Sequence, residues 1–185
     1  MNSELAKHLN ALTVATNSLL REVGPLSSST YYFSPGDGKW SISQILTHLL
    51  TSERLALNYM RKKSQAPVEL LGTAGLKEDI WFFIFELSQQ IPLRYKAPKV
   101  VSENTPPPLS FGDLVRQWEG LRLEMIDFLN SLEAEKIPKK IYKHPIAGRL
   151  TVIHAVRFMA LHVNHHVPQI KAIIARQRRM NLPVA

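Results

Sequence analysis

The chain has 185 residues, of which 45% are hydrophobic and 21% are charged, a composition that excludes a disordered chain and a collagen. It contains no cysteine, which excludes disulfide bonds, catalysis by a protein thiol and cysteine-ligated metal sites. The formal net charge is +8, and all of the excess positive charge lies in residues 136–185, which contain ten Lys and Arg residues but no Asp or Glu.

Two segments near the start of the chain have the apolar periodicity of amphipathic helices. The first spans roughly residues 3–23 and ends at Gly24-Pro25. The second spans roughly residues 41–63, where Ser41 can cap the first turn and Gln44 can complete a capping box. Each segment has one apolar stripe, so both are predicted to pack against a common core.

A connection of about 45 residues, 64–109, separates the second helix from a third over roughly residues 110–134. It contains six prolines and a shorter predicted helix near residues 77–90. Because this connection can carry the chain back across a bundle, the second and third helices can run parallel. Residues 99–101 are the only segment that alternates like a β-strand, and prolines surround it.

A fourth helix spans roughly residues 150–178, with Thr151 as a candidate cap. It carries four of the seven histidines, namely His154, His162, His165 and His166. The four helices predict an all-α protein, a four-helix bundle with a long crossover between helices 2 and 3. The length fits a single domain that covers residues 1–185.

The histidines of the fourth helix suggest a metal site. His162 and His166 are four residues apart, so their imidazoles share one helix face and could hold one metal ion. His162 with His165, three residues apart, is the competing pair. A third ligand is needed, and His48 in the second helix is the best candidate, because it neighbours that helix's apolar stripe. The alternative is that the pair only packs or faces solvent, as His8 and His144 are expected to do.

Two blocks of the sequence resemble the DinB-like superfamily. Residues 39–49, KWSISQILTHL, resemble the start of that family's second helix, and residues 144–170 resemble its last helix. The second block contains HP at 144–145, GRLT at 148–151, Phe158, His162, HH at 165–166 and QI at 169–170. Where the family often has an acid followed by Trp, this chain has His154-Ala155.

The resemblance implies a four-helix bundle that binds a divalent metal ion through His48, His162 and His166. The activities known in the family include thiol-dependent transferases and isomerases that use bacillithiol or mycothiol. Some members have lost the metal ligands, so a non-catalytic metal-binding or ligand-binding protein is the alternative. Dimers are common in the family, and the resemblance therefore also implies a homodimer.

Three neutral imidazoles favour Zn or Ni, with Fe or Co as alternatives, and they leave coordination positions open for water or substrate. Since no ligand is anionic, the site keeps the full charge of the ion, which favours deprotonation of a bound water or thiol near neutral pH. The predicted function is a metal-dependent enzyme that acts on a small-molecule substrate. Its reaction is either transfer of a low-molecular-weight thiol to an electrophile or hydrolysis of an ester or amide.

A metal-ligating histidine also needs a hydrogen bond at its second ring nitrogen. Ser52, four residues after His48, and Gln169, three residues after His166, are in position to supply one. Glu53 is the nearest acid, but at five residues from His48 it is expected to face solvent. The sequence therefore shows no convincing general base, which counts against efficient hydrolysis.

The remaining sequence features concern partners and location. The basic C-terminal region lacks the interleaved aromatic residues of a single-strand binder and matches no DNA-binding motif, so no specific nucleic acid is expected. Helix-end electrostatics account for Arg176, Arg178 and Arg179, with an anionic small ligand as the alternative. No apolar run approaches the about 20 residues that span a bilayer, and the N-terminus has no signal-peptide pattern, so a cytoplasmic location is predicted.

The predicted helix near residues 77–90 contains a dense aromatic patch of Trp81, Phe82, Phe83 and Phe85. This patch is expected to cover one end of the bundle. The alternatives are a wall of the substrate pocket and a dimer surface, because large apolar patches rarely stay exposed.

Overall fold

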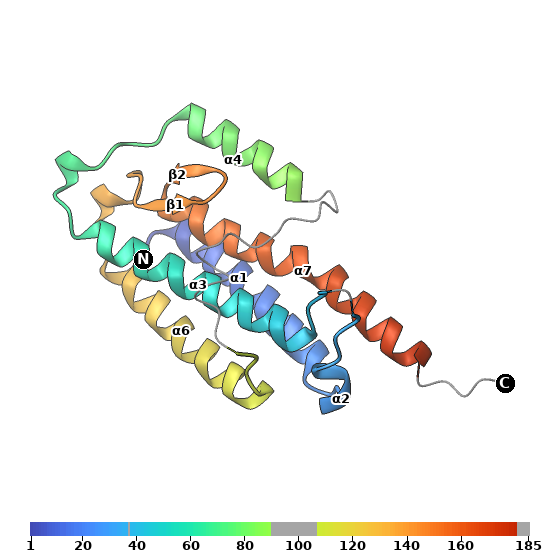
Figure 1. Cartoon of the computed structure of the whole chain (residues 1–185). Coiled ribbons are helices and arrows are strands. Elements are labelled where there is room, and N and C mark those ends of the chain that lie inside the picture. The colour runs from blue at the N-terminus through green and yellow to red at the C-terminus, as the bar shows by residue number, and fades with distance from the viewer. Residues whose placement is uncertain (37, 90–106, 181–185) are drawn as a thin grey trace.

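The computed structural model describes residues 1–36, 38–89 and 107–180, and its long helices form a four-helix bundle (Figure 1). The bundle helices are α1 (Ser3–Val23), α3 (Ile42–Ser64), α6 (Phe111–Ser131) and α7 (Val152–Met180). All four lie where the sequence predicts them, so the predicted bundle is confirmed. The segment 99–101 lies outside the described residues.

Side-chain caps fix where the helices begin. The predicted capping box forms at the start of α3. The backbone N–H of Gln44 donates to Ser41 Oγ at 3.2 Å, and the backbone N–H of Ser41 donates to Gln44 Oε1 at 2.9 Å. At the start of α7, Thr151 Oγ1 accepts a hydrogen bond from the His154 amide at 3.2 Å. Each bond satisfies a backbone donor that the first turn of a helix leaves without a partner.

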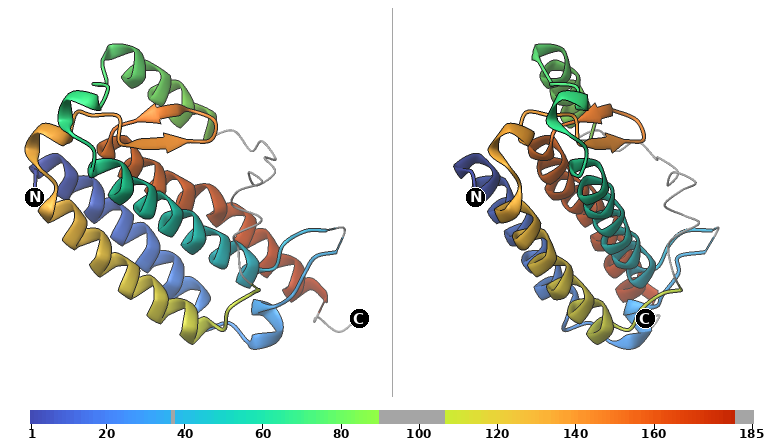
Figure 2. Two further views of the ribbon diagram at one scale, coloured as in Figure 1. Left: turned by 60° about the vertical axis from the view of Figure 1, so that its left-hand side comes forward. Right: turned by 90° about the vertical axis from the view of Figure 1, so that its left-hand side faces the viewer.

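The helices α3 and α6 run parallel, as the long connection between them allows. Where both helices begin, Ser43 Oγ donates to the Leu109 carbonyl at 2.9 Å. Further along both, the Trp118 indole N–H donates to Glu53 Oε1 at 3.1 Å. Residue numbers therefore rise together along the two helices, and Figure 2 shows them side by side. The crossover returns the chain to the end of the bundle at which α3 starts.

The described part of the crossover contains η1 (Val68–Leu70) and the predicted extra helix, α4 (Leu76–Gln89), which lies outside the bundle against α7 (Figure 1). The Phe82 ring stacks on His154 of α7, with 4.5 Å between the ring centroids. Arg157 of α7 donates to both carboxylate oxygens of Glu86, at 2.8 and 2.7 Å. A stacked ring and a bidentate ion pair thus hold α4 on α7.

The aromatic residues of α4 divide between its two faces. Phe82 is 1% exposed, whereas Trp81 and Phe83 are each 58% exposed. The side chain of Phe85 lies outside the described part of the structure. Phe82 therefore packs on the bundle, but the expectation that the whole patch covers the bundle is wrong for Trp81 and Phe83, which remain on the surface.

Between α6 and α7 lies a β-hairpin that the sequence analysis did not predict. Its antiparallel strands are β1 (Tyr142–His144) and β2 (Gly148–Leu150). In the turn, His144 Nδ1 accepts hydrogen bonds from the amides of Ile146 and Ala147, at 3.1 and 3.0 Å. Gly148 has a φ of 79°, a conformation that glycine adopts without strain. Strands of three residues are too short to show alternation, which is why the pattern was missed.

The core lies between the four bundle helices and consists mainly of Leu, Ile, Val and Met side chains around Trp118. The connections after α1 and α6 contain the short helices α2 (Ser28–Tyr31) and η2 (Ala134–Lys136). None of the described helices is long and apolar enough to cross a membrane.

Glu53 lies in this core, and the expectation that it faces solvent is wrong. The residue is 3% exposed, and it accepts hydrogen bonds from Trp118 Nε1 and Arg122 Nη2, each at 3.1 Å. Burial raises the pKa of the Glu53 carboxyl, while Arg122 opposes that rise. The partners lie on α6, far along the chain, so the local helical pattern around Glu53 could not show them.

Candidate metal centre

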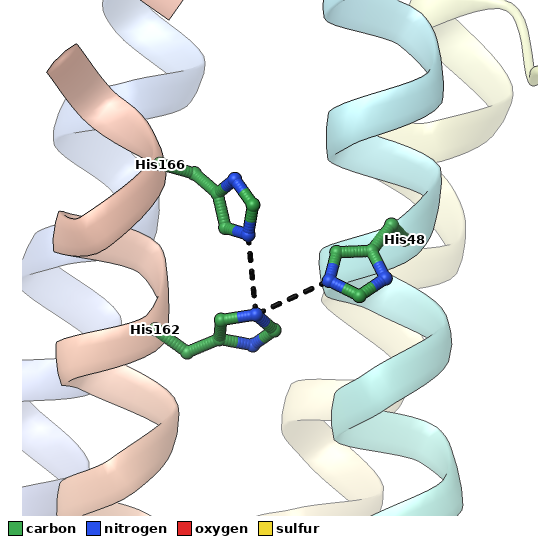
Figure 3. Close-up of side chains that lie close together, drawn as sticks. All are labelled: His48, His162 and His166. Carbon is green, nitrogen blue, oxygen red and sulfur yellow. Dashed lines mark hydrogen bonds between the residues drawn. The ribbon is translucent and has the colours of Figure 1, made fainter. Parts of the chain in front are cut away.

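Three histidines from two helices point toward one another between α3 and α7 (Figure 3). His48 lies in the second turn of α3, and His162 and His166 lie on consecutive turns of α7. His162 Nε2 is 3.2 Å from His48 Nε2 and 3.2 Å from His166 Nε2. The candidate ligand atoms of all three residues lie within 4.8 Å of one another. The fold thus brings together the three residues that the sequence analysis named.

The other described histidines lie outside this cluster. The His165 ring is 5.4 Å from the His166 ring, centroid to centroid, but His165 is not among the grouped ligand atoms. It is therefore the pair four residues apart, rather than His162 with His165, that faces His48. His8 lies on α1, with its Nε2 3.8 Å from a carboxylate oxygen of Glu4.

The three clustered imidazoles are neutral at pH 7. Burial lowers the pKa of His48 to about 3, with a smaller contribution from His166. Burial also lowers the pKa of His166 to about 4, and it holds the pKa of His162 well below its usual value, where the neighbouring histidines add to the effect. Neutral imidazoles offer the nitrogen lone pairs that a metal ion requires.

Hydrogen bonding indicates which ring nitrogens carry those lone pairs. His166 Nδ1 lies 2.9 Å from Gln169 Oε1, as the sequence analysis predicted. Since an amide oxygen can only accept, Nδ1 of His166 carries the proton and its Nε2 presents a lone pair. His162 Nε2 faces two other ring nitrogens but can donate at most one proton, so proton sharing cannot satisfy all three. One central cation would satisfy the three lone pairs together.

The spacing of the nitrogens also suits a metal ion. Zn–N bonds of about 2.0–2.1 Å in tetrahedral geometry put ligand nitrogens about 3.3 Å apart. Two of the three nitrogen pairs here are 3.2 Å apart. The donor set and the distances therefore fit a divalent ion without large movement of α3 or α7.

Two aromatic rings flank the cluster, and the sequence analysis assigned a site role to neither. The Trp40 ring lies 5.0 Å from the His48 ring, centroid to centroid, and the Phe158 ring lies 5.2 Å from the His162 ring at an interplanar angle of 16°. Beyond Phe158, the His144 ring follows at 4.3 Å. The spacing of four residues between Phe158 and His162 was a usable signal, whereas the position of Trp40 depends on the tertiary fold.

The sequence analysis gave Ser52 as a candidate hydrogen-bond partner of His48, and the structure does not show that hydrogen bond. Within the described structure, His48 Nδ1 and Ser52 Oγ are both buried and have no hydrogen-bond partner. A buried donor without a partner is costly, so His48 is held by packing rather than by the second hydrogen bond that His166 has. The three candidate ligands are thus oriented unequally.

The fold and the histidine cluster together define a class of protein. The match to the DinB superfamily covers residues 11–170, so the chain belongs to this superfamily and the resemblance is confirmed. The matched range includes all three clustered histidines. Among curated proteins, none matches the sequence.

A solved structure supports the architecture. The chain is similar to YfiT from Bacillus subtilis, with 17% sequence identity over 96% of this chain and 90% of YfiT, and with a TM-score of 0.59. YfiT is described as a probable metal-dependent hydrolase with an unusual four-helix bundle topology. At this identity the likeness shows a shared fold.

Proposed function

We propose that the chain is a metal-dependent enzyme in which His48, His162 and His166 hold one divalent metal ion. The observation that carries this proposal is the convergence of three neutral imidazoles, with His162 Nε2 at 3.2 Å from each of the other two. Three protein ligands are typical of catalytic rather than structural metal sites, because they leave a coordination position open.

The donor set suits Zn or Ni best, with Fe or Co as alternatives. When bound, such an ion supplies Lewis-acid chemistry and lowers the pKa of a coordinated water or thiol. The protein's part is to keep the imidazoles neutral by burial and to hold the proton of His166 on Nδ1, where Gln169 accepts it.

The leading reaction is hydrolysis of an ester or amide bond in a small-molecule substrate. The shared fold with YfiT, which is described as a probable metal-dependent hydrolase, supports this choice. In this reaction the three histidines would hold the ion, and because the imidazoles are uncharged they would leave its positive charge undiminished for stabilising negative charge on the substrate.

The second candidate is transfer of a low-molecular-weight thiol to an electrophile. One observation favours it: the pKa values of the three imidazoles respond to burial, to neighbouring histidines and, for His166, to the hydrogen bond with Gln169, but to no described carboxylate. A hydrolase usually gains from a general base beside the attacking water. A thiol has a lower pKa than water, so activation by the ion alone suffices more readily.

An activity screen of zinc- and nickel-loaded protein separates these candidates. We expect turnover of at least one ester or amide in a substrate panel, or of an electrophile supplied with bacillithiol, mycothiol or another small thiol. Activity should disappear in His162→Ala and remain in His165→Ala. A protein that retains stoichiometric metal but turns over nothing in either panel is a metal-binding protein without catalysis.

We also propose that the chain forms a homodimer through α4. The outer face of α4 exposes Leu76, Ile80, Phe83 and Leu87, whose exposed fractions range from 47% to 74%. Their spacings of four, three and four residues are those of a seam between two packed helices. A second copy of α4, related by a two-fold axis, presents the same seam and covers an apolar face that monomers rarely expose.

A further inference from the structure

Two aromatic rings, those of Trp40 and Phe158, lie next to the clustered histidines and bear on the class of ligand that the site can bind. Trp40 directly precedes Ser41, the cap of α3, and its ring lies against His48 with an interplanar angle of 52°. Phe158 lies one turn before His162 on α7, and its ring is nearly parallel to that imidazole. The two rings thus come from different parts of the chain and lie against different candidate ligands.

Both rings are only partly buried. Each packs against the hydrophobic core along part of its surface, and neither is among the fully buried residues. Trp40 is held in place from behind by this packing and by the capping box that begins one residue later. A half-buried, well-anchored ring beside a metal site is suited to contact a ligand without first having to become ordered.

Geometry puts these rings within reach of anything bound to the ion. The ion would be held where His162 Nε2 lies 3.2 Å from Nε2 of His48 and of His166. The Trp40 and Phe158 ring centroids lie only 5.0 and 5.2 Å from the imidazole centroids of His48 and His162. A substrate group that extends from the ion toward either ring would contact an aromatic surface.

The immediate surroundings offer aromatic surface rather than charge. In the described part of the chain, the groups that act electrostatically on His48, His162 and His166 are all histidines. A charged group next to the coordinating atom would therefore find no oppositely charged side chain among these groups, whereas a flat uncharged group would gain stacking contacts.

We propose that this site takes a substrate in which the metal-binding oxygen group is joined directly to a flat, uncharged aromatic group, and that Trp40 is the residue that selects for it. The proposal rests on the proposed metal site and adds the class of substrate to it. Phe158 forms a second wall and supports the His162 ring.

Two hydroxamates test the proposal, because they present the same chelating group with different substituents. Zinc-loaded protein is titrated with acetohydroxamate and with benzohydroxamate, and each dissociation constant is corrected for the affinity of that compound for free zinc. We expect wild type to bind benzohydroxamate at least about tenfold more tightly, which corresponds to about 1.4 kcal/mol for an aromatic contact.

The variants isolate the contribution of the flat ring at position 40. Trp40→Phe should keep most of the benzohydroxamate preference, and Trp40→Leu, which keeps apolar bulk without a flat ring, should reduce it to less than about threefold. Trp81→Leu is the matched control, because Trp81 is 58% exposed on α4 and should leave the preference unchanged. Zinc content is measured for every variant.

The outcomes separate this inference from the proposed function. Wild type that binds neither zinc nor acetohydroxamate contradicts the metal site itself. Wild type that binds zinc and acetohydroxamate, but shows no preference for benzohydroxamate, overturns the substrate class while leaving the metal site intact. A preference that survives unchanged in zinc-loaded Trp40→Leu overturns the role of Trp40.

Discussion

At the scale of single residues, the outer ring nitrogen, the Nδ1 atom that does not face the other histidines of the cluster, distinguishes His166 from His48. His166 has Gln169 as a partner for Nδ1 at 2.9 Å, whereas Nδ1 of buried His48 has none in the described structure. A hydrogen bond at the outer nitrogen fixes the tautomer and the ring orientation of a metal-ligating histidine. His166 is therefore the best-oriented ligand, and the affinity for metal should depend on Gln169.

We predict that Gln169→Leu weakens metal binding by about 10–100-fold, the usual effect of removing a partner of a ligating histidine. Gln169 is exposed, so the substitution should leave the fold unchanged. Isothermal titration of metal-free protein with zinc measures the effect. Asn164→Leu, at another exposed position of α7, is the control, and equal zinc affinity in Gln169→Leu and wild type would show that the contact does not orient the ligand.

The sequence could reveal only part of the site at this scale. Helical spacing put His162 and His166 on one face, and the position of His48 beside the apolar stripe of its helix indicated it as their partner, as did the family resemblance. The neighbouring Trp40 and the buried Glu53 could not be placed, because their environments depend on contacts between distant segments. Gln169 was found because its partner lies within one helical turn.

At the scale of helices, a buried ion pair joins α3 to α6. The Glu53 and Arg122 side chains are 4% and 12% exposed, and their charged atoms are 3.1 Å apart. Breaking such a pair leaves an uncompensated charge in the core.

We predict that Glu53→Ala lowers the free energy of unfolding by about 3–5 kcal/mol, because Arg122 then remains buried without its partner. Urea denaturation of metal-free protein measures this loss. Glu124→Ala is the matched control, since Glu124 is 39% exposed in its ion pairs with Arg54 and Arg61 and should cost no more than about 1 kcal/mol. Equal losses in the two variants would contradict the importance of the buried pair.

The exposed seam of α4 leads to a second prediction for the helices. We expect the chain to be a dimer by analytical ultracentrifugation and Phe83→Glu to be a monomer with unchanged circular dichroism, because the charge lies in the middle of the seam. Leu123→Glu is the control, as Leu123 is 65% exposed on α6, away from that seam. A monomeric wild type, or a dimeric Phe83→Glu protein, would rule out this interface.

At the scale of the whole molecule, the buried histidines make the metal-free fold sensitive to acid. Burial lowers the pKa of His48 to about 3 and of His144 and His166 to about 4, and it holds that of His162 well below its usual value. When the pH falls below about 6.5, these histidines take up protons in the unfolded chain, whereas in the folded chain they stay neutral until a lower pH. Protonation therefore favours the unfolded state as the pH falls from about 6.5 to about 4.

We predict that the free energy of unfolding of metal-free protein decreases between pH 7 and pH 5, with each such histidine contributing up to about 1.4 kcal/mol per pH unit. Glu53 acts in the opposite direction, because burial raises its pKa, but the lowered pKa values of His8 and His154 add to the effect of the four histidines. Denaturation by urea at several pH values gives the slope, and His166→Gln should flatten it. Stability that is unchanged or greater at pH 5 would contradict the neutral cluster.

The architecture of the molecule was more accessible from the sequence than its details. Long periodic helices with caps such as Ser41 indicated the bundle, and the length of the connection showed only that α3 and α6 can run parallel. The hairpin at residues 142–150 was missed because its strands are too short for a pattern to develop. Its strands pack on the core through Tyr142 and Leu150, which are 5% and 1% exposed, and His144 accepts two backbone hydrogen bonds in the turn.

The most direct test of the central claim is the metal content of untagged protein, measured by mass spectrometry after dialysis against zinc or nickel and then against metal-free buffer. We expect stoichiometric metal in wild type and in His165→Ala, and loss of it in His48→Ala, because His48 is the ligand supplied by α3. A wild type without stoichiometric metal, or a His48→Ala protein that retains it fully, would contradict the site formed by His48, His162 and His166.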